Sequence, residues 1–210
     1  MIRIFLADDH PMVREAIKSF LARLPDIHCV GEASSGHETV AKVQSLDVDI
    51  VLLDVTMPGR GGLETLEVLK GLSRAPRVLM LTGRSEKQYA VRCMKSGADG
   101  YLTKGQTVQH LRDAIQQIAD GHKFITPRLA EQIAFTFDSS ENRDLHEQLN
   151  NREFEIMCKI AEGLSVSEIA DELFLSAKTI STYRSRIMRK LQLRNSSELM
   201  HYVIKEGFID

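Results

Sequence analysis

Short apolar runs alternate with amphipathic segments over the first 121 residues. The runs are rich in branched side chains, as strands are, and occupy residues 2–7, 28–33, 49–54, 77–82 and 100–103. Between them, apolar residues recur every three or four positions, as on one face of a helix, most clearly over residues 13–24, 63–72 and 111–118. The pattern predicts five successive strand–helix units.

Two of the runs, IVLL at 50–53 and VLML at 78–81, show no polar alternation. Such strands need cover on both faces, which favours a doubly wound parallel sheet with helices on each side. Parallel strands joined by right-handed crossovers end at one common edge, where open α/β sheets bind their ligands. We therefore expect an α/β fold, a five-stranded parallel (βα)5 domain over residues 1–121, with its chemistry at the carboxyl ends of the strands.

The pattern changes after residue 121. Residues 122–148 are largely polar and are predicted to form a linker. From residue 149 to 210 no strand pattern recurs, and three helices are predicted over 153–163, 165–174 and 176–191. Asn150 with Glu153 has the spacing of a capping box, and Ser165 and Ser176 occupy N-cap positions. A small all-α domain is expected here.

Composition is that of a globular protein: of 210 residues, 43% are hydrophobic and 27% are charged. There is no run of eighteen apolar residues, so no membrane span or membrane partner is expected. The N-terminus turns acidic too early for a signal peptide, which predicts a cytoplasmic protein. Cys29, Cys93 and Cys158 are odd in number and widely spaced, and are interpreted as reduced core residues.

The net charge of −2 hides a local asymmetry. No acidic residue lies between Glu172 and Glu198, whereas six basic residues do. Two helices joined by the short turn LFLS, the second of them basic, form a helix-turn-helix, and a helix fits the major groove of double-stranded DNA. This segment is therefore predicted to bind DNA.

Acidic side chains follow two of the predicted strands. Asp8 and Asp9 come after the first strand, and Asp54 ends the third. If these strands are neighbours, the three carboxylates lie close together, where their mutual repulsion favours a bound cation. All-oxygen ligation with room for water and phosphate suits Mg2+.

Two further polar residues are predicted at the same edge. Thr82 ends the fourth strand and Lys104 follows the fifth. A hydroxyl and an ammonium can bind the oxygens of a phosphoryl group. Together with the acids, they indicate phosphoryl transfer to an aspartate. Each residue alone has an ordinary structural explanation, and the ordered set carries the prediction.

The segments ADDH (7–10), DVTMPGRGG (54–62), LT (81–82) and GADGYLTKG (97–105) resemble the receiver domain of two-component response regulators. The resemblance implies a sensor histidine kinase as phosphodonor and Asp54 as phosphoacceptor. It also implies that Asp8, Asp9, Asp54 and the backbone carbonyl of Thr56 bind Mg2+, that Thr82 and Lys104 contact the phosphoryl group, and that Tyr101 is the switch aromatic. Gly105 departs from the proline that many receivers have after the lysine.

Residues 149–210 resemble the LuxR-type helix-turn-helix of the NarL/FixJ response regulators, and details such as TISTYRSRIMRKL look most similar to the GacA/UvrY branch. The resemblance implies a homodimer when phosphorylated. It places Ser181, Thr182 and Ser185 near bases, and Lys178, Arg184, Arg186 and Lys190 on phosphates.

The interpretation is a DNA-binding transcriptional response regulator whose only chemistry is phosphorylation and dephosphorylation of its own Asp54. One alternative is an aspartyl-phosphate phosphotransferase or phosphatase with an external substrate. It would need a substrate-recognition insertion, but the loops have ordinary lengths. Another is a receiver whose output domain binds protein or RNA, which the acid-free basic helix disfavours.

Overall fold

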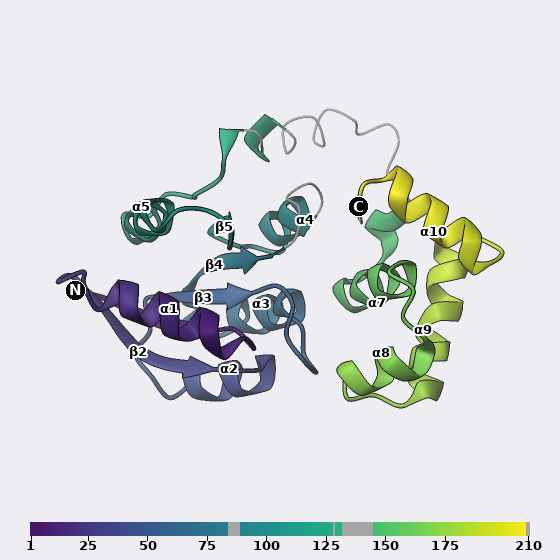
Figure 1. Cartoon of the computed structure of the whole chain (residues 1–210), viewed down its shortest axis with the longest axis horizontal. Coiled ribbons are helices and arrows are strands. Elements are labelled where there is room, and N and C mark those ends of the chain that lie inside the picture. Colours follow the sequence, from purple (N-terminus) through teal and green to yellow (C-terminus); the bar gives the residue numbers. More distant parts are fainter. Residues whose placement is uncertain (84–88, 128, 132–144, 209–210) are drawn as a thin grey trace.

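The computed structural model describes residues 1–83, 89–127, 129–131 and 145–208. Its N-terminal part is a parallel sheet flanked by helices (Figure 1). The strands are β1 (Ile2–Ala7), β2 (Ile27–Ala33), β3 (Ile50–Asp54), β4 (Arg77–Thr82) and β5 (Gly100–Thr103). The helices are α1 (Pro11–Leu21), α2 (Gly36–Val43), α3 (Gly62–Lys70), α4 (Tyr89–Lys95) and α5 (Val108–Ala119). The predicted strands are confirmed to within one residue at each end.

The strands lie in the order β2-β1-β3-β4-β5, and every pairing is parallel. Alternate residues of each strand face opposite layers. On β1, Ile4 and Leu6 pack with α1 and α5, whereas Phe5 and Ala7 pack in the layer of α2, α3 and α4. All residues of β3 are buried, which explains its unbroken apolar run. The predicted doubly wound α/β fold is confirmed.

The C-terminal part is all helical. It contains α7 (Asn151–Ala161), α8 (Val166–Glu172), α9 (Ala177–Lys190) and α10 (Ser196–Lys205). The capping box of Asn150 with Glu153 is formed, and so is a second one of Ser165 with Glu168. Ser176 caps α9 by accepting a hydrogen bond from the amide of Thr179. The helix starts predicted from these caps are confirmed.

The turn between α8 and α9 contains an unusual residue. Phe174 has a φ of 51°, and it is 76% exposed. A bulky side chain rarely adopts this backbone conformation.

No helix in the described ranges is both long enough and apolar enough to cross a membrane.

The predicted linker, residues 122–148, is described only in part, since residues 128 and 132–144 lie outside the described ranges. Its start is attached to the sheet: the amide of Phe124 donates to the carbonyl of Asp99 (2.9 Å), and its carbonyl accepts from the amide of Tyr101 (3.1 Å). Its end forms a 3-10 helix, η1 (Leu145–Gln148). The position of the domain boundaries stays a prediction.

Candidate functional site

Three carboxylates lie together at the carboxyl edge of the sheet. Asp8 and Asp9 follow β1, and Asp54 is the last residue of β3, its neighbour in the sheet. One ligand atom from each of them, and one from His10, lies within 4.8 Å of the others. Asp8 is fully buried, and Asp54 is 2% exposed. The fold therefore brings together the acids that the sequence places after two separate strands.

Lys104, directly after β5, brings a positive charge to these acids. Its ammonium lies 2.7 Å from Asp8 Oδ2 and 2.7 Å from Asp54 Oδ2. Burial raises the pKa of Asp54 to about 6, although the hydrogen bond and charge of Lys104 act to lower it. Burial also acts to lower the pKa of Lys104, but its hydrogen bonds to Asp54 and Asp8 outweigh this and leave it raised. One ammonium thus contacts two of the three carboxyl groups.

The donor set fits a hard divalent cation. Carboxylate oxygens from two adjacent strand ends converge, two of the carboxyl groups are buried, and the lysine alone leaves negative charge uncompensated. Asp8, Asp9 and Asp54 are the side chains that would hold Mg2+. His10 is less suited: it offers nitrogen, its side chain is 64% exposed, and its Nδ1 lies 2.7 Å from Asp9 Oδ1.

The other predicted residues surround this cluster. The amide of Thr56 donates to Asp54 Oδ1 (3.2 Å). Thr82 ends β4 fully buried, and its carbonyl accepts from the amide of Lys104 (2.7 Å), which fixes the adjacent ends of β4 and β5. Tyr101 is 1% exposed and belongs to the core on the side of α2, α3 and α4.

The start of α3 lies against the end of β3, the strand that ends in Asp54. A Cβ atom on Gly62 would lie 2.1 Å from the carbonyl oxygen of Asp54, closer than any real contact, so only glycine allows this approach. The amide of Gly62 donates to the carbonyl of Val55 (2.9 Å). The loop between β3 and α3 is thereby closed tightly behind Asp54, which holds this carboxylate at the edge.

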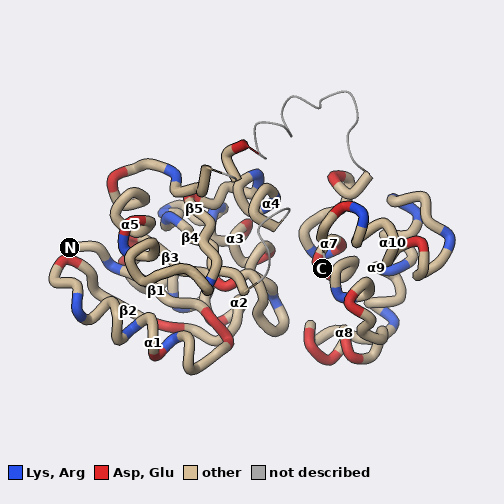
Figure 2. The backbone as a smooth tube through the Cα atoms, turned by 45° about the horizontal axis from the view of Figure 1, so that its top comes forward, with Lys and Arg blue, Asp and Glu red and all other residues tan. Residues whose placement is uncertain are grey.

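The basic helix α9 exposes one face and buries the other. Ile180 and Ile187 are fully buried, whereas six of the predicted contact residues are exposed: Lys178, Ser181, Thr182, Arg184, Ser185 and Arg186. Figure 2 shows the basic positions along α9 and the loop after it without acidic ones between them. Arg184 donates to Ser196 Oγ (2.7 Å) near the start of α10.

Lys190 differs from these six. Its ammonium lies 2.6 Å from Glu153 Oε2 and 3.0 Å from the carbonyl oxygen of Gln148. Its predicted contact with a DNA phosphate stays a prediction, but in this structure its charge is paired inside the C-terminal domain.

Two family models match this architecture. The response regulator receiver domain matches residues 4–116, and the LuxR family of bacterial regulatory proteins matches residues 147–203. The chain belongs to the LuxR family of response regulators. It is a DNA-binding response regulator, and this prediction is confirmed.

Relatives of this response regulator match along its whole length. It is 36% identical to the response regulator GacA of Pseudomonas aeruginosa, over 100% of this chain and 99% of GacA. It is also 36% identical to UvrY of Escherichia coli, over 99% of this chain and 95% of UvrY. The predicted similarity to the GacA/UvrY branch is thus confirmed. Among solved structures, RcsB of Salmonella enterica bound to a promoter with BeF3− is similar, with a TM-score of 0.68, 26% identity and coverage of 97% and 98%.

The two domains of this response regulator are joined by side chains of α4 and α7. Arg92 donates to Asn151 Oδ1 (2.7 Å) and to the carbonyl of Leu149, and its guanidinium lies 4.5 Å from the centre of the Phe154 ring. Asn151 in turn donates to Glu67 Oε1 (2.7 Å). Burial lowers the pKa of Arg92, as expected for a cation in an interface.

A second contact involves the loop after Asp54. The amide of Gly59 donates to the carbonyl of Glu172 (3.0 Å), and its own carbonyl accepts from Arg152 (2.9 Å). Gly59 has a φ of +73°, which suits glycine. The C-terminal domain therefore pairs with both backbone polar groups of one residue in the loop that follows Asp54.

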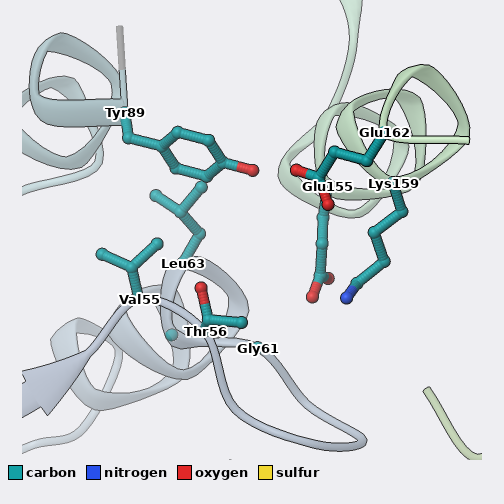
Figure 3. A pocket seen from close by; sticks show the side chains of 9 residues that line it. Val55, Thr56, Gly61, Leu63, Tyr89, Glu155, Lys159 and Glu162 are labelled. Carbon is teal, nitrogen blue, oxygen red and sulfur yellow. The ribbon is translucent and has the colours of Figure 1, made fainter. Parts of the chain in front are cut away.

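Figure 3 shows a small cavity between this loop and α7. Glu155 and Lys159 point from α7 toward Thr56 and Gly61 of the receiver. Burial raises the pKa of Glu155, although Arg152 beside it has the opposite effect. Lys159 is paired with Glu172. Charged groups of the C-terminal domain thus lie close to the loop that follows Asp54.

Sequence reasoning missed this interface. Arg92 and Asn151 are polar residues 59 positions apart, and each reads as a solvent-facing position of its own helix. The available signal in the sequence was the pair Pro58-Gly59 in MPGRGG, which indicates a turn but does not identify the residues that this turn contacts.

Proposed function

We propose that this response regulator accepts a phosphoryl group on Asp54 from a phosphohistidine of a sensor histidine kinase. A carboxylate oxygen of Asp54 forms the new O–P bond as the N–P bond breaks, and the departing imidazole takes a proton from water. The observation that supports this is the buried carboxylate of Asp54 at the carboxyl edge of the sheet, with Asp8 and Lys104 beside it.

The neighbouring residues have distinct roles in this step. When bound by Asp8, Asp9, Asp54 and the carbonyl of Thr56, Mg2+ supplies positive charge that stabilises the transferring phosphoryl group. Lys104 exchanges its carboxylate partners for a phosphoryl oxygen, and Thr82 donates its hydroxyl to another. The movement of Thr82 opens space for Tyr101 to turn, which shifts the receiver toward its active form. External substrates are not turned over.

The output is binding to double-stranded DNA as a homodimer in the cytoplasm. Lys178, Arg184 and Arg186 bind phosphates, and Ser181, Thr182 and Ser185 approach base edges. Their exposure on one acid-free helix supports this assignment. Two subunits on two half-sites raise affinity through effective concentration, which a single small domain cannot do. The promoter complex of RcsB, to which this chain is similar, supports DNA as the partner.

The phosphoacceptor is tested with a small phosphodonor and Mg2+. Asp54→Asn is expected to abolish labelling, while Asp113→Asn, at an exposed acid of α5, is expected to label as the wild type does. Labelling of the Asp54 variant at an unchanged level would show that another residue accepts the phosphoryl group. Steady release of phosphate from many unrelated phosphoesters would support the enzyme alternative instead.

The nucleic-acid partner is tested by the salt dependence of binding. Lys178→Ala is expected to weaken binding to duplex DNA of every sequence and to lower the slope of log affinity against log salt by about one unit. Lys42→Ala, a lysine on the receiver, is the matched control and should leave the slope unchanged. Tighter binding to RNA than to duplex DNA, or equal slopes for both variants, would contradict the assignment of α9.

A further inference from the structure

Lys190 is the last residue of α9, and its charge is directed into the C-terminal domain. Its ammonium contacts Glu153 Oε2 at 2.6 Å and the carbonyl of Gln148 at 3.0 Å. Glu153 is only 2% exposed, and its Oε2 also accepts the amide of Asn150 (2.9 Å) in the capping box of α7. The last turn of α9 is therefore tied to the first turn of α7.

The exposed face of α9 follows a regular spacing that passes beside Lys190. Lys178, Thr182, Ser185 and Arg189 stand at positions i, i+4, i+7 and i+11, which form one stripe along a helix. All four are exposed, and the stripe lies opposite the buried Ile180 and Ile187. Lys190 is rotated from Arg189 by about 100°, toward α7. The stripe therefore ends in Arg189.

The burial of Glu153 opposes a change of partner by Lys190. If the ammonium left to meet a phosphate, a carboxylate that is 2% exposed would lose its cation. Leaving one member of a buried pair without its partner is more unfavourable than a solvent-exposed ion pair is favourable. Arg189 carries no such constraint, since no side chain of the described residues is hydrogen-bonded to it or paired with it in this structure.

We propose that Lys190 is a positioning residue, which sets the last turn of α9 against the start of α7, and that Arg189 meets the DNA phosphate at this turn. The inference rests on the proposed DNA-binding function. It differs from the role that the family resemblance implies for Lys190, and it adds Arg189 to the contact face.

The test uses the full chain with Mg2+ and BeF3−, and a duplex that the wild-type protein has selected from a random pool. Affinity is measured over a salt series at a temperature where circular dichroism shows each variant to be folded. Lys190→Ala is expected to weaken binding roughly tenfold, as the loss of one base-pair readout does, with the salt slope unchanged. Arg189→Ala is expected to lower the slope by about 0.9.

Glu153→Gln separates the two roles of Lys190. This change keeps a residue suited to the capping box but removes the charge that holds the lysine. Positioning predicts weaker DNA binding, because α9 loses its anchor. Direct phosphate contact predicts equal or tighter binding, because the lysine becomes free.

Several results would overturn the inference. A slope that falls by about one unit in Lys190→Ala would show that this lysine touches DNA. Unchanged affinity of the folded Lys190→Ala variant would show that the pair only stabilises the domain. If the Lys190→Ala variant does not fold, Arg189→Ala, a change at the surface, still tests the inference. An unchanged salt slope in Arg189→Ala would reject the inference. Absence of salt-dependent duplex binding by the wild type would instead overturn the proposed function, and this inference with it.

Discussion

Replacing Arg92 by Ala is expected to loosen the contact between the two domains by about two orders of magnitude. Arg92 donates to Asn151 Oδ1 and to the carbonyl of Leu149, and it lies over the ring of Phe154. Hydrogen bonds from a charged group contribute about 1.5–3 kcal/mol each, and a partly exposed cation–π contact about 0.5–1 kcal/mol. Because such contributions are not additive, we take about 3 kcal/mol in all, or roughly a hundredfold in the equilibrium.

The amide of Gly59 reports this equilibrium directly. Its hydrogen-bond acceptor is the carbonyl of Glu172, which belongs to the other domain. Hydrogen exchange at Gly59, measured by NMR, therefore requires separation of the domains and should accelerate roughly a hundredfold in Arg92→Ala. The amide of Leu52, within the buried strand β3, should exchange at its wild-type rate.

Arg112→Ala is the matched control, since this arginine is exposed on α5. It should leave exchange at Gly59 unchanged. If Arg92→Ala also left it unchanged, the contacts of Arg92 would contribute nothing to domain association. If Leu52 accelerated together with Gly59, the variant would be unfolding the receiver, and the interface reasoning would be refuted.

Three further outcomes are expected. Asp8→Asn should reduce Mg2+-dependent labelling of Asp54 by at least roughly tenfold, since it removes a predicted ligand, and equal labelling at all Mg2+ concentrations would exclude that role. Arg3 holds the pKa of Asp49 below its usual value. The stability that this ion pair gives to the fold is therefore complete above the unfolded pKa of about 3.9, and it is lost as the pH falls through the lower pKa of the folded state. Because the Asp49 side chain is 39% exposed, Asp49→Asn should lower the free energy of unfolding, measured in urea at pH 7, by only about 0.5–1 kcal/mol, and by less as the pH falls. A difference from the wild type that stays constant with pH would contradict this. Ile187→Ala, at a fully buried position of α9, should lower the free energy of unfolding of the C-terminal domain by about 2–5 kcal/mol, and a smaller loss would mean that the site collapses around the missing atoms.

The parallel sheet could be predicted because its signals are local. The apolar run ending in Asp54 marks a strand that is buried on both faces, and the structure places the whole of β3 inside. Convergence of the acids follows from parallel topology, since every strand ends at one edge, together with the adjacency of β1 and β3. The caps at Asn150 and Ser165 likewise depend on a spacing of three residues, which a sequence shows directly.

Features that depend on distant pairing could not be predicted in this way. Periodicity places Lys190 between the buried and the exposed face of α9, and only the burial of Glu153, 37 positions away, decides where its ammonium goes. The position of Tyr101 in the core depends on how β5 packs against α4, which the four-residue run GYLT does not specify. The contact of Gly59 with Glu172 joins two backbones, and backbone groups carry no sequence signal.

The attachment of Phe124 to β5 has a consequence for the isolated receiver. As a border strand, β5 would present bare amide and carbonyl groups, and such borders recruit strands from other molecules. The segment leaving the domain covers the start of this border, since Phe124 pairs with the carbonyl of Asp99, directly before β5, and with the amide of Tyr101. A fragment ending at residue 121 should consequently self-associate, whereas one extended by a few residues past Phe124 should remain monomeric.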